Sequence, residues 1–405
     1  MNVLFVSPGF PPEMPFFTRG LASVGARVIG LGDQPEANLP AMTRDNLGAY
    51  FRINGFADEA GMLAEIEKIS RQVRIDRIEC LWEPMMIPVA RAREKLGIPG
   101  MTAAETIPFR DKEVMKQVLD DAGIRTPRHA NATTAGEVRE AASKVGFPLV
   151  IKPIAGAGSA DTYKCRSAEE LEGVLSKMRH IPEVSVEEFI EGEDFTFDTI
   201  CADGKVLFEN ICFYRPRALI SRTNDWISPQ TVAVRDVEAD WLRSGREMGY
   251  AVLKALGFKT GFTHMEWYRK PDGEAIFGEI GCRSAGARTV DVMNWAADTD
   301  SFRNWAEAVC HGRITAPLEK KYNAVAIFKR AEGEGRIQRI EGLARLMNEF
   351  GQHICAIDLT PLGAPKRPAS QTLIGDGFVM LRHPDLAAAL ELGDRVATEL
   401  RLYAG

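Results

Sequence analysis

The sequence predicts a mixed α/β (α+β) protein in which a parallel-sheet domain is followed by a small α+β domain and an antiparallel-sheet domain. Short apolar runs alternate with helical patterns through the first hundred residues, which is typical of a parallel sheet with crossover helices. Shorter strand and helix patterns share residues 126–205, and a hairpin signal lies within residues 263–286. These three observations set the order of the domains.

The N-terminal part carries the parallel-sheet pattern. Strands are expected at 3–6, 27–31 and 78–82, and helices at 15–25, 58–73 and 86–96. Ligands of parallel sheets usually bind beyond the carboxyl ends of the strands. The residues at those ends are Pro8, Gly9, Asp33, Glu83 and Pro84. Turn formation alone is the more frequent explanation of such residues, so both interpretations stay open.

Proline and glycine at positions 98–100 and Pro108 indicate a domain boundary. A helix is expected over 111–123, with Asp111 as its cap and Gly123 as its stop. Further helices are expected at 135–145 and 167–178, and strands at 147–153, 162–165, 184–190 and 194–201.

The second half is less regular. Residues 213–235 are rich in Arg and Pro without clear periodicity, which predicts an irregular loop that serves as a binding element or a lid. Helices are expected at 236–256, within 287–310, and at 339–349 and 384–400. We therefore divide the chain into four domains, at 1–105, 106–200, 201–315 and 316–405.

Composition excludes several classes of function. The 405 residues are 45% hydrophobic and carry a formal charge of -6, which gives no electrostatic reason to expect a nucleic-acid or anionic-membrane partner. The seven scattered cysteines contain no Cys-x-x-Cys pair, which argues against a disulfide framework and a zinc site. No apolar segment is long enough to span a bilayer, and the N-terminus lacks a signal-peptide pattern. A cytoplasmic enzyme is expected.

The hairpin places two carboxylates opposite each other. Asp272 and Gly273 favour a two-residue loop, and this register pairs Glu266 with Glu279. Opposed like charges are destabilising. A divalent cation between them would convert repulsion into coordination, and Mg²⁺ suits one or two carboxylates together with water and phosphate oxygens. A solvated face, or a bulge that shifts the register, is the alternative. The same register pairs His264 with Gly281 and Tyr268 with Phe277.

Two further motifs favour a phosphate-bearing nucleotide. An apolar strand ends at Lys152, and Gly156, Gly158 and Ser159 follow in a loop that lets backbone N–H groups approach a phosphate. The spacing matches neither the Walker nor the dinucleotide pattern, and a plain hairpin loop is the alternative. Residues 187–194 form an acidic bend around a glycine, which suits a purine edge and ribose hydroxyls but is also common as a surface turn.

Taken in order, these motifs resemble the ATP-grasp superfamily over roughly residues 1–315. The order is Lys112 on a helix, Lys152, the glycine loop, the hinge VEEFIEGEDFTF and the hairpin HMEWYRKPDGEAIFGEIGCR. The resemblance implies an ATP-grasp fold with a Rossmann-like N-terminal domain, a small lid domain and a central antiparallel sheet. It implies that ATP binds with Mg²⁺ or Mn²⁺ as its metal. The implied nucleotide contacts are Lys112, Lys152, the glycine loop, Glu187, Glu188, Phe189, Ile190 and Asp194, with Glu187 at the adenine amine and Asp194 at the ribose.

The resemblance also assigns the metal and the chemistry. Glu266 and Glu279 would hold the metal, and Glu279 and Arg283 would be catalytic, with Arg283 on a transferring phosphoryl group or developing oxyanion. Many members have Asn where this chain has Gly281, so one metal ligand is missing. The segment looks closest to bacterial L-amino-acid ligases, which implies ATP-dependent joining of a small carboxylate and an amine through an acylphosphate. Dimers are common among relatives, so a homodimer is compatible with the resemblance.

Substrate contacts and competing functions remain open at this level. Candidate substrate residues are His264, Arg215, Arg217 and Arg222, each of which also fits an ordinary packed or solvated role. A carboxyphosphate-forming or purine-pathway ligase of the same fold is one alternative, and a protein that binds ATP without turnover is another. The N-terminus also resembles two-domain glycosyltransferases, whose paired glutamates match the spacing of Glu341 and Glu349. That pair falls on an expected amphipathic helix, which makes the match weak.

Overall fold

The computed structural model describes residues 1–154, 161–178, 180–224, 226–367 and 374–405. Its N-terminal part is a four-stranded parallel sheet in the order β3-β2-β1-β4. The strands are β1 (Asn2–Val6), β2 (Arg27–Gly32), β3 (Ala49–Arg52) and β4 (Arg77–Glu79). The helices are α1 (Met14–Ser23), α2 (Ala41–Arg44), α3 (Glu59–Gln72), α4 (Met86–Leu96) and α5 (Ala103–Thr106). The expected strands and helices of this part are present. The strand β3 was not predicted, because its four residues are only partly buried and carry no clear apolar pattern.

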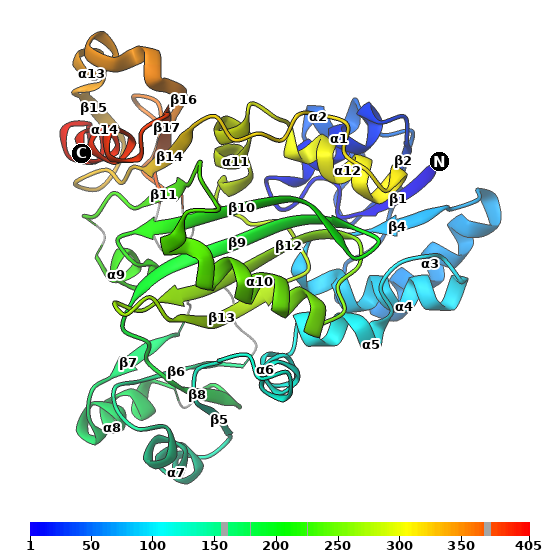
Figure 1. Ribbon diagram of the computed structural model, residues 1–405. Helices are drawn as coiled ribbons and strands as arrows, with labels where there is room; N and C mark the ends of the chain where they lie inside the picture. The colour runs from blue at the N-terminus through cyan, green and yellow to red at the C-terminus, as the bar shows by residue number, and fades with distance from the viewer. Residues whose placement is uncertain (155–160, 179, 225, 368–373) are drawn as a thin grey trace.

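The small domain is a four-stranded antiparallel sheet in the order β5-β8-β6-β7. Its elements are β5 (His129–Ala132), α7 (Ala135–Val145), β6 (Leu149–Pro153), β7 (Tyr163–Cys165), α8 (Ala168–Lys177) and β8 (Val184–Glu188). The helix α6 (Lys112–Asp121) precedes this domain, and its Met115 and Leu119 pack in the core of the main body. Asp111 caps α6 as expected, because its carboxylate accepts from the N–H groups of Glu113 and Val114. Figure 1 shows this domain as a separate lobe below the main body.

An eight-stranded sheet forms the body of the molecule, in the order β13-β12-β9-β10-β11-β14-β17-β16 (Figure 1). Its strands are β9 (Glu193–Ala202), β10 (Lys205–Arg215), β11 (Gln230–Ala233), β12 (Gly261–Arg269), β13 (Ala275–Gly281), β14 (Asn323–Phe328), β16 (Ile354–Leu359) and β17 (Gly377–His383). The helices of this region are α9 (Ala218–Thr223), α10 (Arg243–Ala255), α11 (Thr289–Ala297), α12 (Ser301–His311), α13 (Leu343–Phe350) and α14 (Leu386–Glu399). A two-stranded sheet pairs β15 (Ile337–Glu341) with β18 (Arg401–Ala404). The regions 201–315 and 316–405 therefore share one sheet.

The N-terminal part packs on the body through α1 and α12. The Phe17 ring lies 4.9 Å from the Phe302 ring and 5.2 Å from the Trp305 ring, both edge-on and fully buried. A Cβ on Gly20 would lie 2.5 Å from the Phe302 carbonyl oxygen, so the helices approach this closely only because position 20 has no side chain. Within the described ranges no helix combines the length and apolar character needed to cross a bilayer.

Two expectations about the second half are wrong. Residues 213–235 do not form one irregular loop, because β10 continues to Arg215 and α9 and the buried β11 follow. The helix expected at 339–349 is split at Gly342, which has a φ of 85° and separates β15 from α13. Glu341 and Glu349 therefore lie on different elements, so the explanation of their spacing by one amphipathic helix is wrong.

Candidate active site

The hairpin β12–β13 brings the two predicted carboxylates together. Glu266 pairs with Glu279 and His264 pairs with Gly281, as the sequence predicts. The side chains of both glutamates are 39% exposed and lie on the same face of the sheet.

The register shifts between Glu266 and Trp267, which makes the second half of the predicted pairing wrong. Trp267 pairs with Phe277, and the loop runs from Lys270 to Glu274 instead of spanning two residues. The shift falls at Gly278, where a Cβ would lie 2.8 Å from the Glu266 carbonyl oxygen. The bulge turns Phe277 into the core beside Trp267, away from the face that Glu279 occupies.

Three lysines surround the acidic groups. Lys112 Nζ lies 3.1 Å from Glu279 Oε2, and Lys152 Nζ lies 2.8 Å from Glu187 Oε2. Lys116 Nζ lies 2.5 Å from the other Glu187 oxygen and is almost completely buried. The sequence reasoning missed Lys116, although its position one helical turn after Lys112 is a usable signal.

The pKa values of this cluster favour full ionisation of Glu187. Burial alone raises the pKa of Glu187, but Lys152 and Lys116 overcome that effect and hold its pKa well below the usual range. Burial lowers the pKa of Lys152, yet the attraction of Glu187 and Glu279 leaves it raised. Burial dominates for Lys116, whose pKa is lowered. Two ammonium groups thus share the Glu187 carboxylate, and Lys152 is also attracted by Glu279 and Glu266 of the hairpin.

The hinge residues at the end of β8 and directly after it point in different directions. Glu188 faces outward, where its carboxylate accepts from Arg125 at 2.9 Å and from the Arg128 backbone at 3.2 Å. The Phe189 ring lies under Lys164, whose Nζ is 3.4 Å from the ring centroid.

Arg217 closes over the far end of the hinge. Its Nε donates to Asp194 Oδ1 at 2.7 Å, and its Nη1 donates to the Ile190 carbonyl at 3.0 Å. Burial raises the pKa of Asp194, and the Arg217 guanidinium offsets part of that rise. Arg217 therefore occupies hydrogen-bonding groups that the sequence predicts for the nucleotide.

His264 is buried beside the glutamate pair. Its Nδ1 lies 2.6 Å from Asp198 Oδ1, and its Nε2 lies 3.6 Å from Glu266 Oε1. Burial lowers the pKa of His264, but Asp198 outweighs burial and raises that pKa to about 9. Asp198 is fully buried and also accepts from Thr196 and Asn210. Asp198 was not singled out in the sequence, although it stands directly opposite His264 in the β9–β12 register.

Arg283 reaches across to the N-terminal part. Its Nε donates to Glu83 Oε2 at 2.8 Å, and Arg110 contacts the same carboxylate. A Cβ on Gly281 would lie 3.3 Å from the Arg283 Cγ, so the glycine leaves room for the arginine stem.

The remaining predicted residues are not gathered here. Arg215 pairs with Asp394 on α14 through two contacts of 3.0 and 3.1 Å, which ties β10 to the C-terminal helix. Arg222 belongs to α9, but its side chain lies outside the described residues, and so do Gly156, Gly158 and Ser159.

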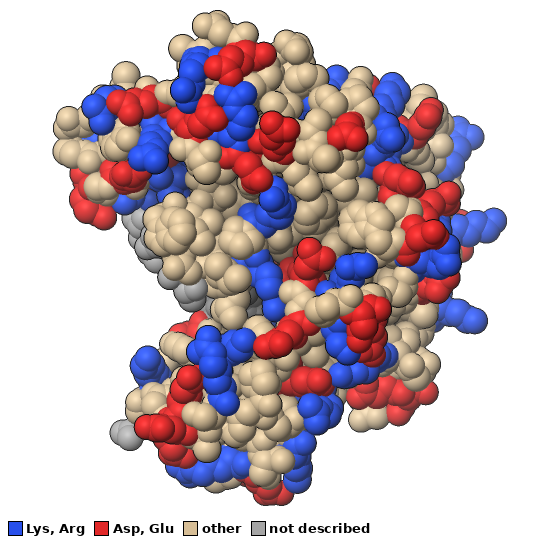
Figure 2. Space-filling model, turned by 60° about the vertical axis from the view of Figure 1, so that its left-hand side comes forward, with Lys and Arg blue, Asp and Glu red and all other residues tan. Residues whose placement is uncertain are grey.

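The donor set fits a hard divalent cation. Glu266 and Glu279 offer carboxylate oxygens on an exposed face, while the neighbouring Lys112 and Lys152 suit the phosphates that complete the coordination of Mg²⁺. Among the described residues no group of three or more His, Cys, Asp or Glu side chains forms a closed metal site. Figure 2 shows the hollow between the small lobe and the main body, where acidic and basic side chains meet.

Comparison with known proteins places this geometry in a family. Residues 22–100 match the ATP-grasp N-terminal domain and residues 117–295 match the ATP-grasp domain. The L-arginine-specific L-amino acid ligase of Bacillus subtilis is 26% identical over 56% of this chain and 54% of its own length. The formate-dependent phosphoribosylglycinamide formyltransferase of Bacteroides thetaiotaomicron is 25% identical over 91% of this chain and 92% of its own length.

The fold is also similar to that of a solved structure. The crystal structure of L-amino acid ligase from Bacillus licheniformis matches all of this chain and 98% of its own, with a TM-score of 0.80 at 18% identity. The chain spans between half and two thirds of the length of the first curated relatives that it matches. The two family matches together cover most of the chain, in the order and at the positions of the sheets described above, and the chain therefore belongs to the ATP-grasp family.

Proposed function

We propose that this protein is an ATP-dependent ligase that joins a small carboxylate to an amine, releasing ADP and phosphate. The observation that carries the proposal is the convergence of Lys152 from the small domain with Glu266 and Glu279 from the body. Both glutamates contribute to the raised pKa of Lys152, although they follow it by more than a hundred residues. Such convergence supports a phosphate chain held between the two lobes.

The nucleotide would lie along the hinge. Lys112 and Lys152 would contact its phosphates, with the glycine loop above them, while Phe189 and Ile190 would offer backbone groups to adenine. Glu187 would hold both Lys116 and Lys152 in place in addition to its proposed contact with the adenine amine. Arg217 already donates to the Ile190 carbonyl and to Asp194, and each of these acceptors has a further lone pair for the nucleotide.

Glu266 and Glu279 would hold Mg²⁺ or Mn²⁺, which supplies charge neutralisation for the transferring phosphoryl group. The carboxylate substrate would attack the γ-phosphate to give an acylphosphate and ADP, and the amine would then displace phosphate. Arg283, fixed by Glu83, would stabilise the negative charge that develops on the oxygens. His264, cationic at neutral pH, would orient Glu266 and border the acyl group.

An amino acid is the proposed substrate class, supported by similarity to L-amino acid ligases. A purine-pathway or carboxyphosphate-forming ligase is the second candidate, favoured by the formyltransferase whose length this chain matches almost fully. A cytoplasmic location and a homodimer belong to the same proposal.

The test is ADP release by the purified protein with Mg²⁺-ATP against amino acids and small carboxylates, singly and in pairs. The control variant is Glu279→Gln. Turnover that requires an acid and an amine and disappears in the variant supports the ligase. Turnover with bicarbonate or a phosphorylated amine alone supports the second candidate. Binding of ATP without turnover under any pair contradicts both.

A further inference from the structure

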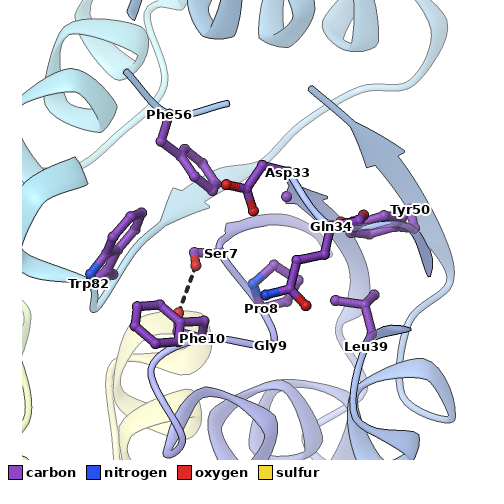
Figure 3. Close-up of a pocket in the computed structure, with 11 residues that line it drawn as sticks. Ser7, Pro8, Gly9, Phe10, Asp33, Gln34, Leu39, Tyr50, Phe56 and Trp82 are labelled. Atoms are coloured by element: carbon purple, nitrogen blue, oxygen red, sulfur yellow. Dashed lines mark hydrogen bonds between the residues drawn. The ribbon is translucent and has the colours of Figure 1, made fainter. Parts of the chain in front are cut away.

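A pocket lies at the carboxyl edge of the N-terminal parallel sheet, outside the nucleotide cluster. Its volume is about 240 Å³, and the ends of β1, β2 and β4 and the residues that follow them line it (Figure 3). Pockets for drug-sized ligands are usually larger, about 300–1,000 Å³. The pocket therefore has room for one amino-acid side chain and not for a nucleotide.

Aromatic rings form one wall of this pocket. The Trp82 ring stands edge-on to Phe10 and to Phe56, with centroid distances of 5.5 and 5.2 Å. Phe10 is 48% exposed at the rim, whereas Phe56 is buried. In Figure 3 the three rings lie on the same side, and Tyr50 and Leu39 lie opposite. The faces of aromatic rings attract a cation, and the rings also pack against the apolar groups that such a cation carries.

The polar groups of the pocket are acidic or neutral. Asp33 extends over the space between the two walls (Figure 3), and within the described ranges its carboxylate has no hydrogen-bond or ion-pair partner. None of the lining residues is Lys or Arg. Burial and then the charge of Asp33 raise the pKa of Tyr50, while Arg52, bonded to the Asp33 backbone carbonyl, lowers it in part. Among the described lining residues a cation finds a carboxylate and three rings, whereas an anion finds no cationic side chain.

The pocket is joined to the candidate active site through the chain itself. Trp82 immediately precedes Glu83, and Glu83 accepts the hydrogen bond from Arg283. A group held against Trp82 therefore sits one residue from the carboxylate that fixes the proposed catalytic guanidinium.

We propose that this pocket binds the side chain of the amine substrate, and that this side chain is a small organic cation, a guanidinium or ammonium on an apolar stem. The apolar stem packs among Phe10, Phe56 and Trp82, and the charged nitrogen faces Asp33. The role as a substrate subsite rests on the proposed ligase function, whereas the binding of the cation does not. The lining offers no Lys or Arg to a phosphate, which separates this proposal from the purine-pathway candidate.

The test compares L-arginine with L-citrulline, which has nearly the same shape without the charge, and with ribose 5-phosphate. Dissociation constants are measured by calorimetry on the full chain without ATP. L-arginine is expected to bind about tenfold more tightly than L-citrulline, and ribose 5-phosphate is expected not to bind. Asp33→Asn should abolish the preference for L-arginine and leave the affinity for L-citrulline unchanged, and Trp82→Leu should weaken both. The exposed Asp45→Asn is the matched control and should change neither.

Equal binding of the two amino acids, tighter binding of ribose 5-phosphate, or an unchanged preference in Asp33→Asn would overturn the proposal. Mg²⁺-ATP binding is measured on the same proteins and should be the same in Asp33→Asn as in the unaltered chain. Loss of ATP binding with intact L-arginine binding would refute the ligase and leave the cation pocket standing. Intact ATP turnover with no preference for a cationic amine would refute the pocket and leave the ligase.

Discussion

Arg283 donates a hydrogen bond to Glu83 at 2.8 Å across a separation of 200 residues. The Glu83 carboxylate also forms a salt bridge with Arg110. One carboxylate from the N-terminal part therefore fixes two guanidinium groups at the edge of the site. Arg283 leaves the end of β13 close to the glutamate pair. The orientation of the proposed catalytic arginine is therefore set by a domain that the ATP-binding motifs do not include.

Replacing Glu83 by Gln should reduce kcat about tenfold to hundredfold, because a loosened guanidinium no longer points at the developing charge. The KM for ATP should change little, since no nucleotide contact is lost. Steady-state kinetics at saturating amine measure both constants. Glu94→Gln on the exposed side of α4 is the control. If kcat fell only together with the melting temperature, Glu83 would have a merely structural role.

Lys116→Met should destabilise the fold by about 3 kcal/mol, because the buried Glu187 loses one of two cations while a side chain of similar volume remains. Lys144→Met, at a salt bridge whose groups are both about two-thirds exposed, should change stability by less than about 0.5 kcal/mol. Urea unfolding at pH 7 measures both. The double variant with Glu187→Gln should recover part of the loss. If Lys116→Met changed the unfolding free energy no more than Lys144→Met does, the contact between Lys116 and Glu187 would not contribute to stability.

The pair of His264 and Asp198 should make stability depend on pH. The pKa of His264 rises from 6.5 to about 9 on folding, so its stabilisation is complete below pH 6.5 and is lost as the pH rises through 9. This pKa shift corresponds to a contribution of at most about 3 kcal/mol to the free energy of unfolding. Unfolding free energies of the unaltered chain and His264→Gln should differ most at pH 6 and converge near pH 9.5. Burial lowers the pKa of Lys320 to about 8, and Asp198 acts on Lys320 as well as on His264, so His264→Gln is compared with the unaltered chain at every pH. A difference that stays constant with pH would argue against the ion pair.

Two glycines inside helices should respond with opposite signs to the same substitution. A Cβ on Gly245 in α10 would lie 2.1 Å from the fully buried Trp267 ring, so Gly245→Ala should cost about 1–3 kcal/mol through overpacking. Gly173 in α8 has nothing within 4 Å of that position, so Gly173→Ala should stabilise by about 0.5–1 kcal/mol. Thermal melts of the two variants measure the pair. A stable Gly245→Ala would mean that α10 shifts freely on the sheet.

The sequence predicts the glutamate pair because turn chemistry and strand alternation are local signals. Glu266 and Glu279 face each other, and His264 lies on the same face, as two-residue periodicity requires. A bulge that shifts the register is one of the alternatives that the sequence leaves open, and an isolated glycine inside a strand pattern is a signal for one, but the sequence does not show where along the hairpin it falls. The pairing of Tyr268 with Phe277 failed for that reason.

The buried charges were beyond local reasoning. Lys116 meets Glu187 across 71 residues and Asp198 meets His264 across 66, and no short-range pattern reports such contacts. The irregular segment was misjudged for a related reason. Burial of β11 depends on β14, a strand that lies nearly a hundred residues further along the chain.

The pairing of β11 with β14 has a consequence for fragments of this protein. A chain cut after residue 315 would lose β14, β17 and β16, and β11 would become a sheet edge with unpaired backbone groups. Such an edge recruits strands from other molecules and leads to aggregation. The segment 117–295 that matches the ATP-grasp domain ends before β14 and therefore lacks the strand that covers β11. A soluble fragment that keeps the site must extend beyond β17, past residue 383.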